Sequence, residues 1–203
     1  MPGRKILSLL LFVCVLAIPV GAPRAGENLL PYVEPNEEGL HVQPWFMNSF
    51  RDLREDMAEA AAEGKQLVII WEQKGCPYCL EMHRVNFRQP DIVDYIRANF
   101  LVVQLNLWGD KEVTDVDGKV TTEKKLARKY RLQFTPTLQF FPKTLAKDNK
   151  KPGHKVEVWR LLGYWKPFDF KNTFRYVREE SYKTEPNFQR WLLNVRKKMQ
   201  AEG

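Results

Sequence analysis

The chain has 203 residues, of which 44% are hydrophobic and 28% charged, and its net charge is +7. These values are ordinary for a globular protein, and the length suits one domain with additions or two very small domains. The excess of basic residues is mild and spread along the sequence, and it lacks an aromatic–basic motif. Nucleic acid is therefore not an expected partner.

The first 25 residues resemble a targeting segment. Arg4 and Lys5 precede an almost unbroken apolar run at residues 6–18, and small residues follow at positions 20–22. This order is typical of a secretory signal peptide. The run is short for a membrane span, which needs about 20 apolar residues, so we expect a cleaved signal rather than a retained N-terminal anchor. In both cases the folded part is exported, and we expect a periplasmic location.

The rest of the chain is expected to form a tail and one domain. Residues 26–47 contain three prolines and few apolar residues, which predicts an extended N-terminal tail, and the domain then takes residues 48–203. In chain order the patterns predict helix 48–63, strand 66–72, a helix that begins beside residues 76–79 and breaks near 89–90, helix 91–99, strand 100–107, a loop or small hairpin at 108–121, helix 122–130, strands 138–141 and 156–161, and helices 167–182 and 186–199. In the first helix, Asn48 or Ser49 is the expected N-cap, and Phe50, Leu53 and Met57 are expected on the inner face.

This order of elements predicts an α/β fold. Helices that connect the early strands require parallel pairing, whereas the late strand hairpin requires antiparallel pairing. We therefore expect a central mixed β-sheet flanked by helices, with an extra helix at the C-terminus.

The most informative motif is a pair of cysteines, Cys76 and Cys79, separated by Pro77 and Tyr78. The pair stands where a strand-like run ends and a helix-like run begins. A thiol in the first turn of a helix faces free backbone N–H groups and the positive end of the helix dipole, which stabilise a thiolate. Because the thiolate is the nucleophile in disulfide exchange, the motif predicts a thiol–disulfide oxidoreductase.

The cysteine count supports a catalytic pair. The third cysteine, Cys14, lies inside the N-terminal apolar run, so cleavage would leave only Cys76 and Cys79. An exported protein with one close pair has no disulfide framework. The pair also supplies only two metal ligands, and no second cluster completes a zinc site, so no metal is expected.

A second motif, Thr135-Pro136, precedes the strand predicted at residues 138–141. Together with the cysteine pair about 60 residues earlier, it resembles the signature of the thioredoxin superfamily. Residues 71–79, 82–83, 86–87, 103–110, 134–137 and 174–179 resemble the SoxW-type periplasmic thioredoxins, which accompany bacterial sulfur oxidation.

The resemblance implies roles for individual residues. Cys76 would attack and Cys79 would resolve the mixed disulfide. Thr135 and Pro136 would bind the substrate as an added strand, and the residues around the first cysteine, Gly75, Pro77 and Tyr78, would contact it. The resemblance implies no cofactor, a membrane thiol transporter of the CcdA type as electron donor, and cysteine-containing periplasmic proteins as substrates.

Two positions depart from the thioredoxin pattern. Gly75 stands where thioredoxins have Trp before the first cysteine, and Ile70 stands where they have a buried Asp that takes the proton of the resolving cysteine. The nearest acidic residue is Glu72. We hypothesise that Glu72, or a water it holds, takes this proton; the alternative is a solvated Glu at the strand end. His83, two helical turns past Cys76, is a weak candidate for proton transfer.

Three classes of function remain open from the sequence. The first is a reductase of the cell envelope. The second is a disulfide oxidase or isomerase with the same chemistry, although residues 26–47 are short for the dimerisation domain that such isomerases use. The third is a thioredoxin-fold binding module without enzymatic activity, which would need further ligands near the cysteine pair.

Overall fold

A computed structural model describes residues 28–146 and 148–202. The predicted signal segment, residues 1–25, lies outside this range. Within the described residues, no helix combines the length and the apolar character needed to cross a bilayer.

The helices are α1 (Leu53–Ala62), α2 (Pro77–Val85), α3 (Pro90–Asn99), α4 (Glu123–Lys129), α5 (Pro167–Arg178) and α6 (Phe188–Glu202). Short 3₁₀ turns lie at Asn86–Arg88, Gly153–Lys155 and Ser181–Lys183. The strands are β1 (Gln66–Glu72), β2 (Phe100–Asn106), β3 (Glu112–Thr114), β4 (Val120–Thr122), β5 (Thr137–Phe140) and β6 (Trp159–Leu162).

The central sheet is mixed, as the sequence predicted. Its strand order is β2-β1-β5-β6; β1 pairs with β2 in parallel, whereas β5 pairs with both β1 and β6 in antiparallel. The parallel pair is joined through α2 and α3, which supply the crossover that such a pair requires. β3 and β4 form a separate small hairpin between β2 and α4, so the region predicted as a loop or a small hairpin contains a hairpin.

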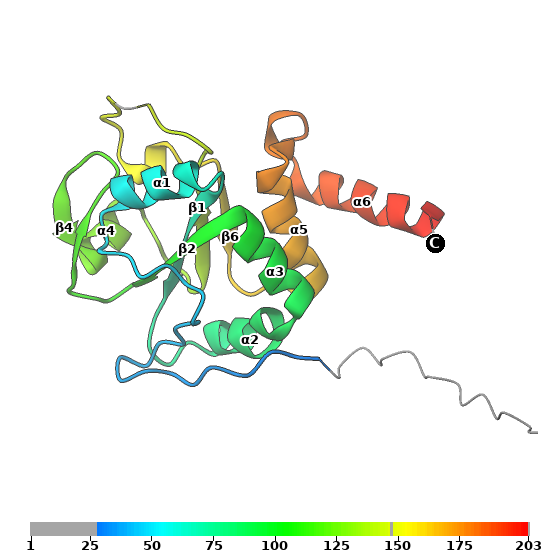
Figure 1. The fold of residues 1–203 in the computed structure, drawn as a ribbon, viewed down its shortest axis with the longest axis horizontal. Coiled ribbons are helices and arrows are strands. Elements are labelled where there is room, and N and C mark those ends of the chain that lie inside the picture. The colour runs from blue at the N-terminus through cyan, green and yellow to red at the C-terminus, as the bar shows by residue number, and fades with distance from the viewer. Residues whose placement is uncertain (1–27, 147, 203) are drawn as a thin grey trace, which may run out of the picture.

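Helices cover both faces of this sheet (Figure 1). Val68 and Ile70 of β1 face the core shared with α2, α3 and α5, whereas Leu67, Ile69 and Trp71 face the core shared with α1 and α4. Every residue of β1 is buried, because successive side chains of a strand point to opposite faces and both faces are covered. The extra C-terminal helix α6 projects from the body beyond α5 (Figure 1) and buries mainly Phe188 and Leu192.

Helix α1 begins later than the sequence predicted. Asp52 is the N-cap, and its side chain accepts hydrogen bonds from the backbone N–H groups of Arg54 and Glu55. Arg51 has a φ of 64°, which no helix can contain, and Phe50 is 92% exposed. Ser49 donates its hydroxyl to Asp56 instead of capping the helix, so the predicted caps and the predicted inner position of Phe50 were wrong.

The boundaries of several later elements also differ from the prediction, and two of these differences have a clear cause. The last strand begins at Trp159, three residues later than expected, because a 3₁₀ turn occupies Gly153–Lys155. Helix α5 ends at Arg178, because Glu180 adopts a left-handed conformation that stops the helix.

The N-terminal segment, defined as residues 28–47, lies against the domain. The backbone of Leu30 bonds to that of Arg88 after α2, and the N–H of Met47 donates to the carbonyl of Val102 in β2. Leu40, His41 and Gln43 are buried. In Figure 1 the segment runs beneath α2 before it turns towards α1. The segment contains no helix or strand, and it forms one wall of the domain near α2.

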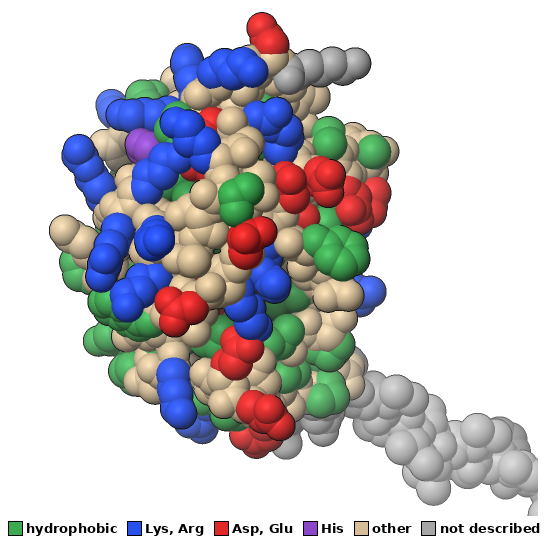
Figure 2. All heavy atoms as spheres, turned by 90° about the vertical axis from the view of Figure 1, so that its left-hand side faces the viewer, with side chains coloured by type: hydrophobic (Ala, Val, Ile, Leu, Met, Phe, Trp, Pro, Cys, Tyr) green, Lys and Arg blue, Asp and Glu red, His purple; other side chains and the backbone are tan. Residues whose placement is uncertain are grey.

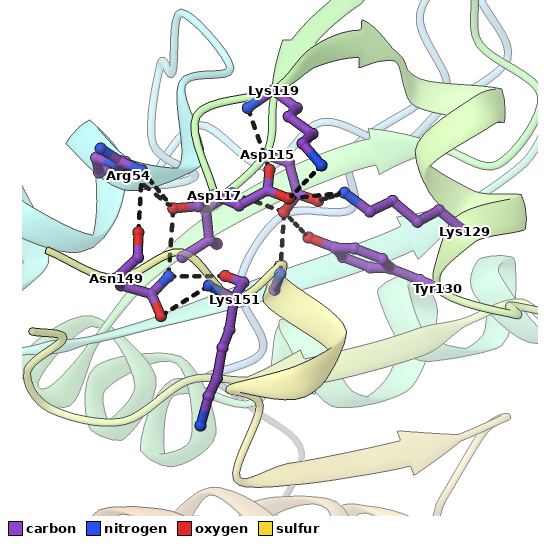
Figure 3. A network of polar contacts seen from close by, with 10 residues as sticks. Arg54, Asp115, Asp117, Lys119, Lys129, Tyr130, Asn149 and Lys151 are labelled. Atoms are coloured by element: carbon purple, nitrogen blue, oxygen red, sulfur yellow. Dashed lines mark hydrogen bonds and ion pairs between the residues drawn. The ribbon is translucent and has the colours of Figure 1, made fainter.

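A buried polar network fixes the connection between β5 and β6 (Figure 3). Asp115 is fully buried and accepts hydrogen bonds from the Tyr130 hydroxyl, from Lys129 Nζ at 2.5 Å and from the Gly153 N–H at 3.0 Å. Burial and the Asp115 carboxylate raise the pKa of Tyr130 well above its usual range, so the tyrosine stays protonated as a donor. Because each partner satisfies the carboxylate, we assign this network a structural role.

Charged side chains are unevenly placed on the surface. Figure 2 shows the face with α4 and the β3–β4 hairpin, where lysine and arginine side chains gather towards the left and top and acidic side chains towards the right and bottom. The N-terminal segment contains Glu34, Glu37 and Glu38 but no lysine or arginine. Charges that are spread along the sequence are therefore partly separated in space.

Candidate active site

The two cysteines form a disulfide at the start of α2. Cys76 is the N-cap residue of this helix, and its Sγ accepts a hydrogen bond of 3.1 Å from the N–H of Cys79. When the pair is reduced, the same N–H group and the helix dipole favour negative charge on Cys76. This is the arrangement that the motif predicted.

The residues around the pair explain why the helix begins there. Gly75 has a φ of +72°, a conformation that turns the chain sharply after β1 and that other residues rarely adopt. Pro77 then occupies the first helical position, where its missing N–H costs no hydrogen bond. Tyr78 is 61% exposed, so it is available to a partner beside the disulfide.

Thr135 and Pro136 lie directly against the first cysteine. The peptide bond between them is cis, and Pro136 is buried at the start of β5. The Thr135 hydroxyl donates to Cys76 Sγ at 3.3 Å, and the Thr135 carbonyl oxygen lies 3.5 Å from the same sulfur. The structure thus brings together two motifs that are 59 positions apart in the chain.

The two cysteines differ in exposure. Cys76 retains 8% of its accessible surface, whereas Cys79 retains 2%. Cys79 lies one turn into the helix and is covered, so Cys76 is the more accessible of the two sulfurs. This difference supports the predicted order in which Cys76 attacks and Cys79 resolves.

Glu72 ends β1 and is 1% exposed, so it is not a solvated residue at a strand end. Its Oε1 accepts a hydrogen bond of 2.8 Å from His83 Nε2, and its Oε2 accepts one of 3.0 Å from Gln104 Nε2. Both carboxylate oxygens are therefore occupied by nitrogen donors, and neither makes a hydrogen bond to a cysteine sulfur within the described residues.

His83 connects Glu72 to the N-terminal segment. Its Nδ1 accepts a hydrogen bond of 2.9 Å from Gln43 Nε2, so its proton is on Nε2, facing Glu72. His83 is fully buried and lies four residues after Cys79, on the same face of α2. Counting from Cys79 rather than Cys76 would have identified this neighbour from the sequence, whereas nothing in the local sequence of Gln43 indicates its role.

A cleft of about 560 Å³ opens beside the disulfide. The N-terminal segment forms one wall of this cleft, and the turn into α2 forms the other. Its lining includes Tyr32, Glu34 and His41 from the segment, and Lys74, Cys76 and Cys79 from the turn and helix. The sequence did not indicate that residues before the domain would reach the cysteine pair.

Two further exposed aromatic side chains belong to loops near the site. Trp108, 58% exposed, donates through Nε1 to Gln73 Oε1, at 2.7 Å, just before the cysteine motif. Phe134, 57% exposed, immediately precedes Thr135. No group of three or more His, Cys, Asp or Glu side chains that could hold a metal ion occurs in residues 28–146 and 148–202.

Comparison with known proteins gives the family. A model of a thioredoxin-like domain matches residues 53–178. No curated protein matches the sequence. Among solved structures, the chain is similar to a thioredoxin-fold protein from Helicobacter pylori, at 18% identity and a TM-score of 0.53, over 69% of this chain and 87% of that one.

Two other solved structures are similar with lower TM-scores. A thioredoxin from Thermus thermophilus is 28% identical, with a TM-score of 0.47, over 62% of this chain and 83% of that one. The C-terminal domain of DsbD from Neisseria meningitidis, in the reduced form, is 17% identical, with a TM-score of 0.42, over 61% of this chain and 91% of that one. Since the family model spans more than half of the sequence and the fold agrees with it, the chain belongs to the thioredoxin-like domain family.

Proposed function

We propose that this protein is a thiol–disulfide oxidoreductase whose dithiol is Cys76 and Cys79. The observation that carries the proposal is the disulfide at the N-terminus of α2, with Cys76 in contact with Thr135. Membership of the thioredoxin-like family supports the same chemistry.

The reaction follows from the geometry of the pair. In the reduced protein the Cys76 thiolate attacks one sulfur of a substrate disulfide, forms a mixed disulfide, and releases the other substrate sulfur as a thiolate that takes up a proton. Cys79 then loses its proton and attacks Cys76 Sγ. The Cys76–Cys79 disulfide forms, and the second substrate sulfur leaves as a thiol after it gains a proton. The substrate is reduced by two electrons and the dithiol is oxidised by two.

Thr135 and Pro136 suit the substrate side of this reaction. Pro136 has no N–H to donate to a neighbouring strand, and it immediately precedes β5, next to the Thr135 that contacts Cys76. An extended substrate segment would pair with the backbone of Thr135, while Gly75, Pro77 and Tyr78 would contact it from the other side.

We place the protein in the cell envelope as a reductase related to the SoxW-type thioredoxins. The signal-like N-terminus and the single cysteine pair of the exported part support this placement. A membrane thiol transporter of the CcdA type would supply the electrons, cysteine-containing periplasmic proteins would receive them, and the process served would be sulfur oxidation. The sequence resemblance supports these assignments.

The direction of electron flow separates the reductase from the oxidase or isomerase. The test is the reduction of insulin by the purified protein, with Cys76→Ser as the inactive control. Oxidation of a reduced, unfolded substrate by the disulfide form is measured in parallel. Fast insulin reduction and an equilibrium potential near that of thioredoxin support the reductase; fast substrate oxidation with an oxidising potential contradicts it. If neither reaction depends on Cys76, the protein is a binding module and the proposed function is wrong.

A further inference from the structure

His41 is the imidazole that the N-terminal segment brings to the dithiol cleft, within the described residues. It lines the cleft together with Cys76 and Cys79, and it is 8% exposed. The inference drawn from it deepens the proposed function and rests on it. It concerns the proton that Cys79 loses during resolution, for which Ile70 offers no acceptor at the position where thioredoxins have a buried Asp.

The hydrogen bonds of His41 determine which ring nitrogen is free. Nδ1 lies 2.9 Å from the carbonyl oxygen of Val33, which can only accept, so Nδ1 carries a hydrogen and donates it. In the neutral ring, Nε2 then carries the lone pair. Nε2 makes no hydrogen bond with any residue in the described part of the chain, and it is not among the fully covered polar atoms that lack a partner.

The two buried polar groups next to this ring, His83 and Glu72, already have hydrogen-bond partners on all their side-chain nitrogen and oxygen atoms. His83 uses both nitrogens, one towards Gln43 and one towards Glu72, and Glu72 uses both oxygens. The rings of His41 and His83 lie 5.0 Å apart between centroids. His41 is therefore the imidazole that can accept a proton from the cleft without first breaking a hydrogen bond.

We propose that His41 is the base of the resolution step: its Nε2 takes the proton of the Cys79 thiol, directly or through one water in the cleft. The Cys79 thiolate attacks Cys76 Sγ, the Cys76–Cys79 bond forms, and the bond from Cys76 to the substrate sulfur breaks. The departing substrate thiolate then takes the proton from Nε2 of His41, so the imidazole is neutral again and no proton is lost or gained. Imidazole suits this cycle because it exchanges protons readily near neutral pH.

Glu72 then has a role different from direct proton transfer. Its buried carboxylate holds His83, whose ring faces His41, so the negative charge of Glu72 favours a transient positive charge on the histidine pair. Glu72 is a positioning residue for His41, acting through His83. Titratable and charged groups surround His41 on three sides. Its own segment contributes Tyr32 and Glu34, and β1 and the turn after it contribute Glu72 and Lys74. Helix α2 and its N-cap contribute Cys76, Cys79 and His83.

The test separates attack from resolution in a single turnover. The reduced protein is mixed with an aromatic disulfide whose thiolate is coloured when released. The first release reports attack by Cys76, and the second reports resolution by Cys79. The variant His41→Asn keeps a nitrogen near the position of Nδ1 for the bond to Val33 and removes Nε2. We expect the second release to slow about tenfold or more at neutral pH, and its pH profile to lose the inflection of the wild type.

His154 provides a matched control, since it is the remaining histidine of the chain and packs against Tyr130 rather than the cleft. His154→Asn should leave both releases unchanged. If His41→Asn resolves with the wild-type rate and pH profile, the inference is overturned while the proposed function stands. If the wild-type protein shows no release at all, the proposed function itself fails.

A second measurement uses the unmodified protein and does not depend on the folding of a variant. The proton NMR signal of the His41 ring is titrated in the oxidised and in the reduced protein. Because His41 shares the cleft with the thiols, we expect the titration midpoint to differ between the two states. Identical titration curves would contradict a direct role for His41.

Discussion

Glu72 and His83 form a hydrogen-bonded pair in the interior of the protein, with Oε1 and Nε2 separated by 2.8 Å. The strand β1 brings the carboxylate and the helix α2 brings the imidazole, and the two residues are 1% and 0% exposed. A buried carboxylate is tolerated only where donors replace its water shell, and His83 and Gln104 do so here. The pair therefore links the end of the central strand to the helix that carries the dithiol.

The charge of Glu72 is expected to influence the resolution step. Glu72→Gln keeps the shape of the side chain and removes its negative charge, so a protonated imidazole near it becomes less favourable. We expect the second thiolate release to slow at neutral pH and its pH profile to change. Stopped-flow measurement of the second thiolate release checks this, with the exposed residue Glu59 of α1, changed to Gln, as the charge-matched control. An unchanged profile in Glu72→Gln would show that the pair is only structural.

The order of attack predicts different behaviour for the two cysteine variants. Cys79→Ser retains the accessible Cys76 and lacks the resolving thiol, so it should accumulate a mixed disulfide and release only one substrate thiolate. Cys76→Ser leaves a covered thiol and should release almost none. Mass spectrometry of the protein after reaction identifies the adduct. Equal adduct formation by the two variants would contradict the assignment of Cys76 as the attacking cysteine.

The parts of the fold that depend on local patterns were predicted correctly from the sequence. The continuous apolar run of β1 indicated a strand covered on both faces, and the change from a strand-like to a helix-like run at Cys76 and Cys79 indicated the beginning of α2. The start of α1 was wrong because Asn48, Ser49 and Asp52 are all suitable caps, and only the positive φ of Arg51 excludes the earlier two.

The network around Glu72 could not be predicted, because it depends on contacts between distant positions. His83 is 11 residues from Glu72, and Gln43 is 40 residues from His83. Hydrophobic periodicity says which side of an element is buried, but a single His or Gln in an irregular segment carries no periodicity. The position of His41 in the cleft follows from how residues 28–47 pack, and composition alone indicated only an extended tail.

The hydroxyl of Thr135 is expected to stabilise the attacking thiolate. Thr135→Val preserves the shape of the side chain and removes the hydrogen bond of 3.3 Å to Cys76 Sγ. A hydrogen bond to a charged group contributes about 1.5–3 kcal/mol, so the first thiolate release should slow by about tenfold at neutral pH and recover at high pH. The same change at Thr121, in the separate β3–β4 hairpin, is the control. If Thr135→Val attacks at the wild-type rate, the hydroxyl has no part in activating Cys76.

The Asp115 network is expected to contribute to stability rather than to catalysis. Asp115→Ala leaves the Tyr130 hydroxyl and the Gly153 N–H without their acceptor in the interior, and it leaves Lys129 Nζ with Asp117 alone (Figure 3). Removal of one partner from a buried charged network costs about 3–5 kcal/mol, which urea denaturation of the oxidised protein measures. Asp110→Ala, at an exposed position in the preceding loop, should leave the stability unchanged. Equal stability of the two variants would contradict the structural role.

The buried carboxyl group of Asp56 is expected to make the stability of the protein depend on pH. The residue is 3% exposed, and its two oxygens accept hydrogen bonds of 2.8 and 2.7 Å from the single hydroxyl of Ser49. Burial raises the pKa of Asp56 from its ordinary value of 3.8 to about 6, with smaller contributions from the acidic neighbours Asp52, Glu55 and Glu59. The folded protein therefore binds this proton more tightly than the unfolded chain does.

The sign of the pH dependence follows from that difference. Between pH 3.8 and about 6 the folded state holds more protons at Asp56 than the unfolded state, so this residue's contribution to stability falls as the pH rises through this range. Above about pH 6 the buried carboxylate is ionised, and its unfavourable contribution to stability no longer changes with pH. Asp56→Asn cannot ionise, so the free energy of unfolding at pH 8 should increase by about 2 kcal/mol, and the difference from the wild type should shrink as the pH falls towards 4. Urea denaturation at several pH values measures this difference. Asp94→Asn, at an exposed position on α3, is the control, because Asp94 does not contribute to the pKa shift of Asp56. A constant difference between Asp56→Asn and the wild type across this pH range would show that Asp56 does not titrate on folding.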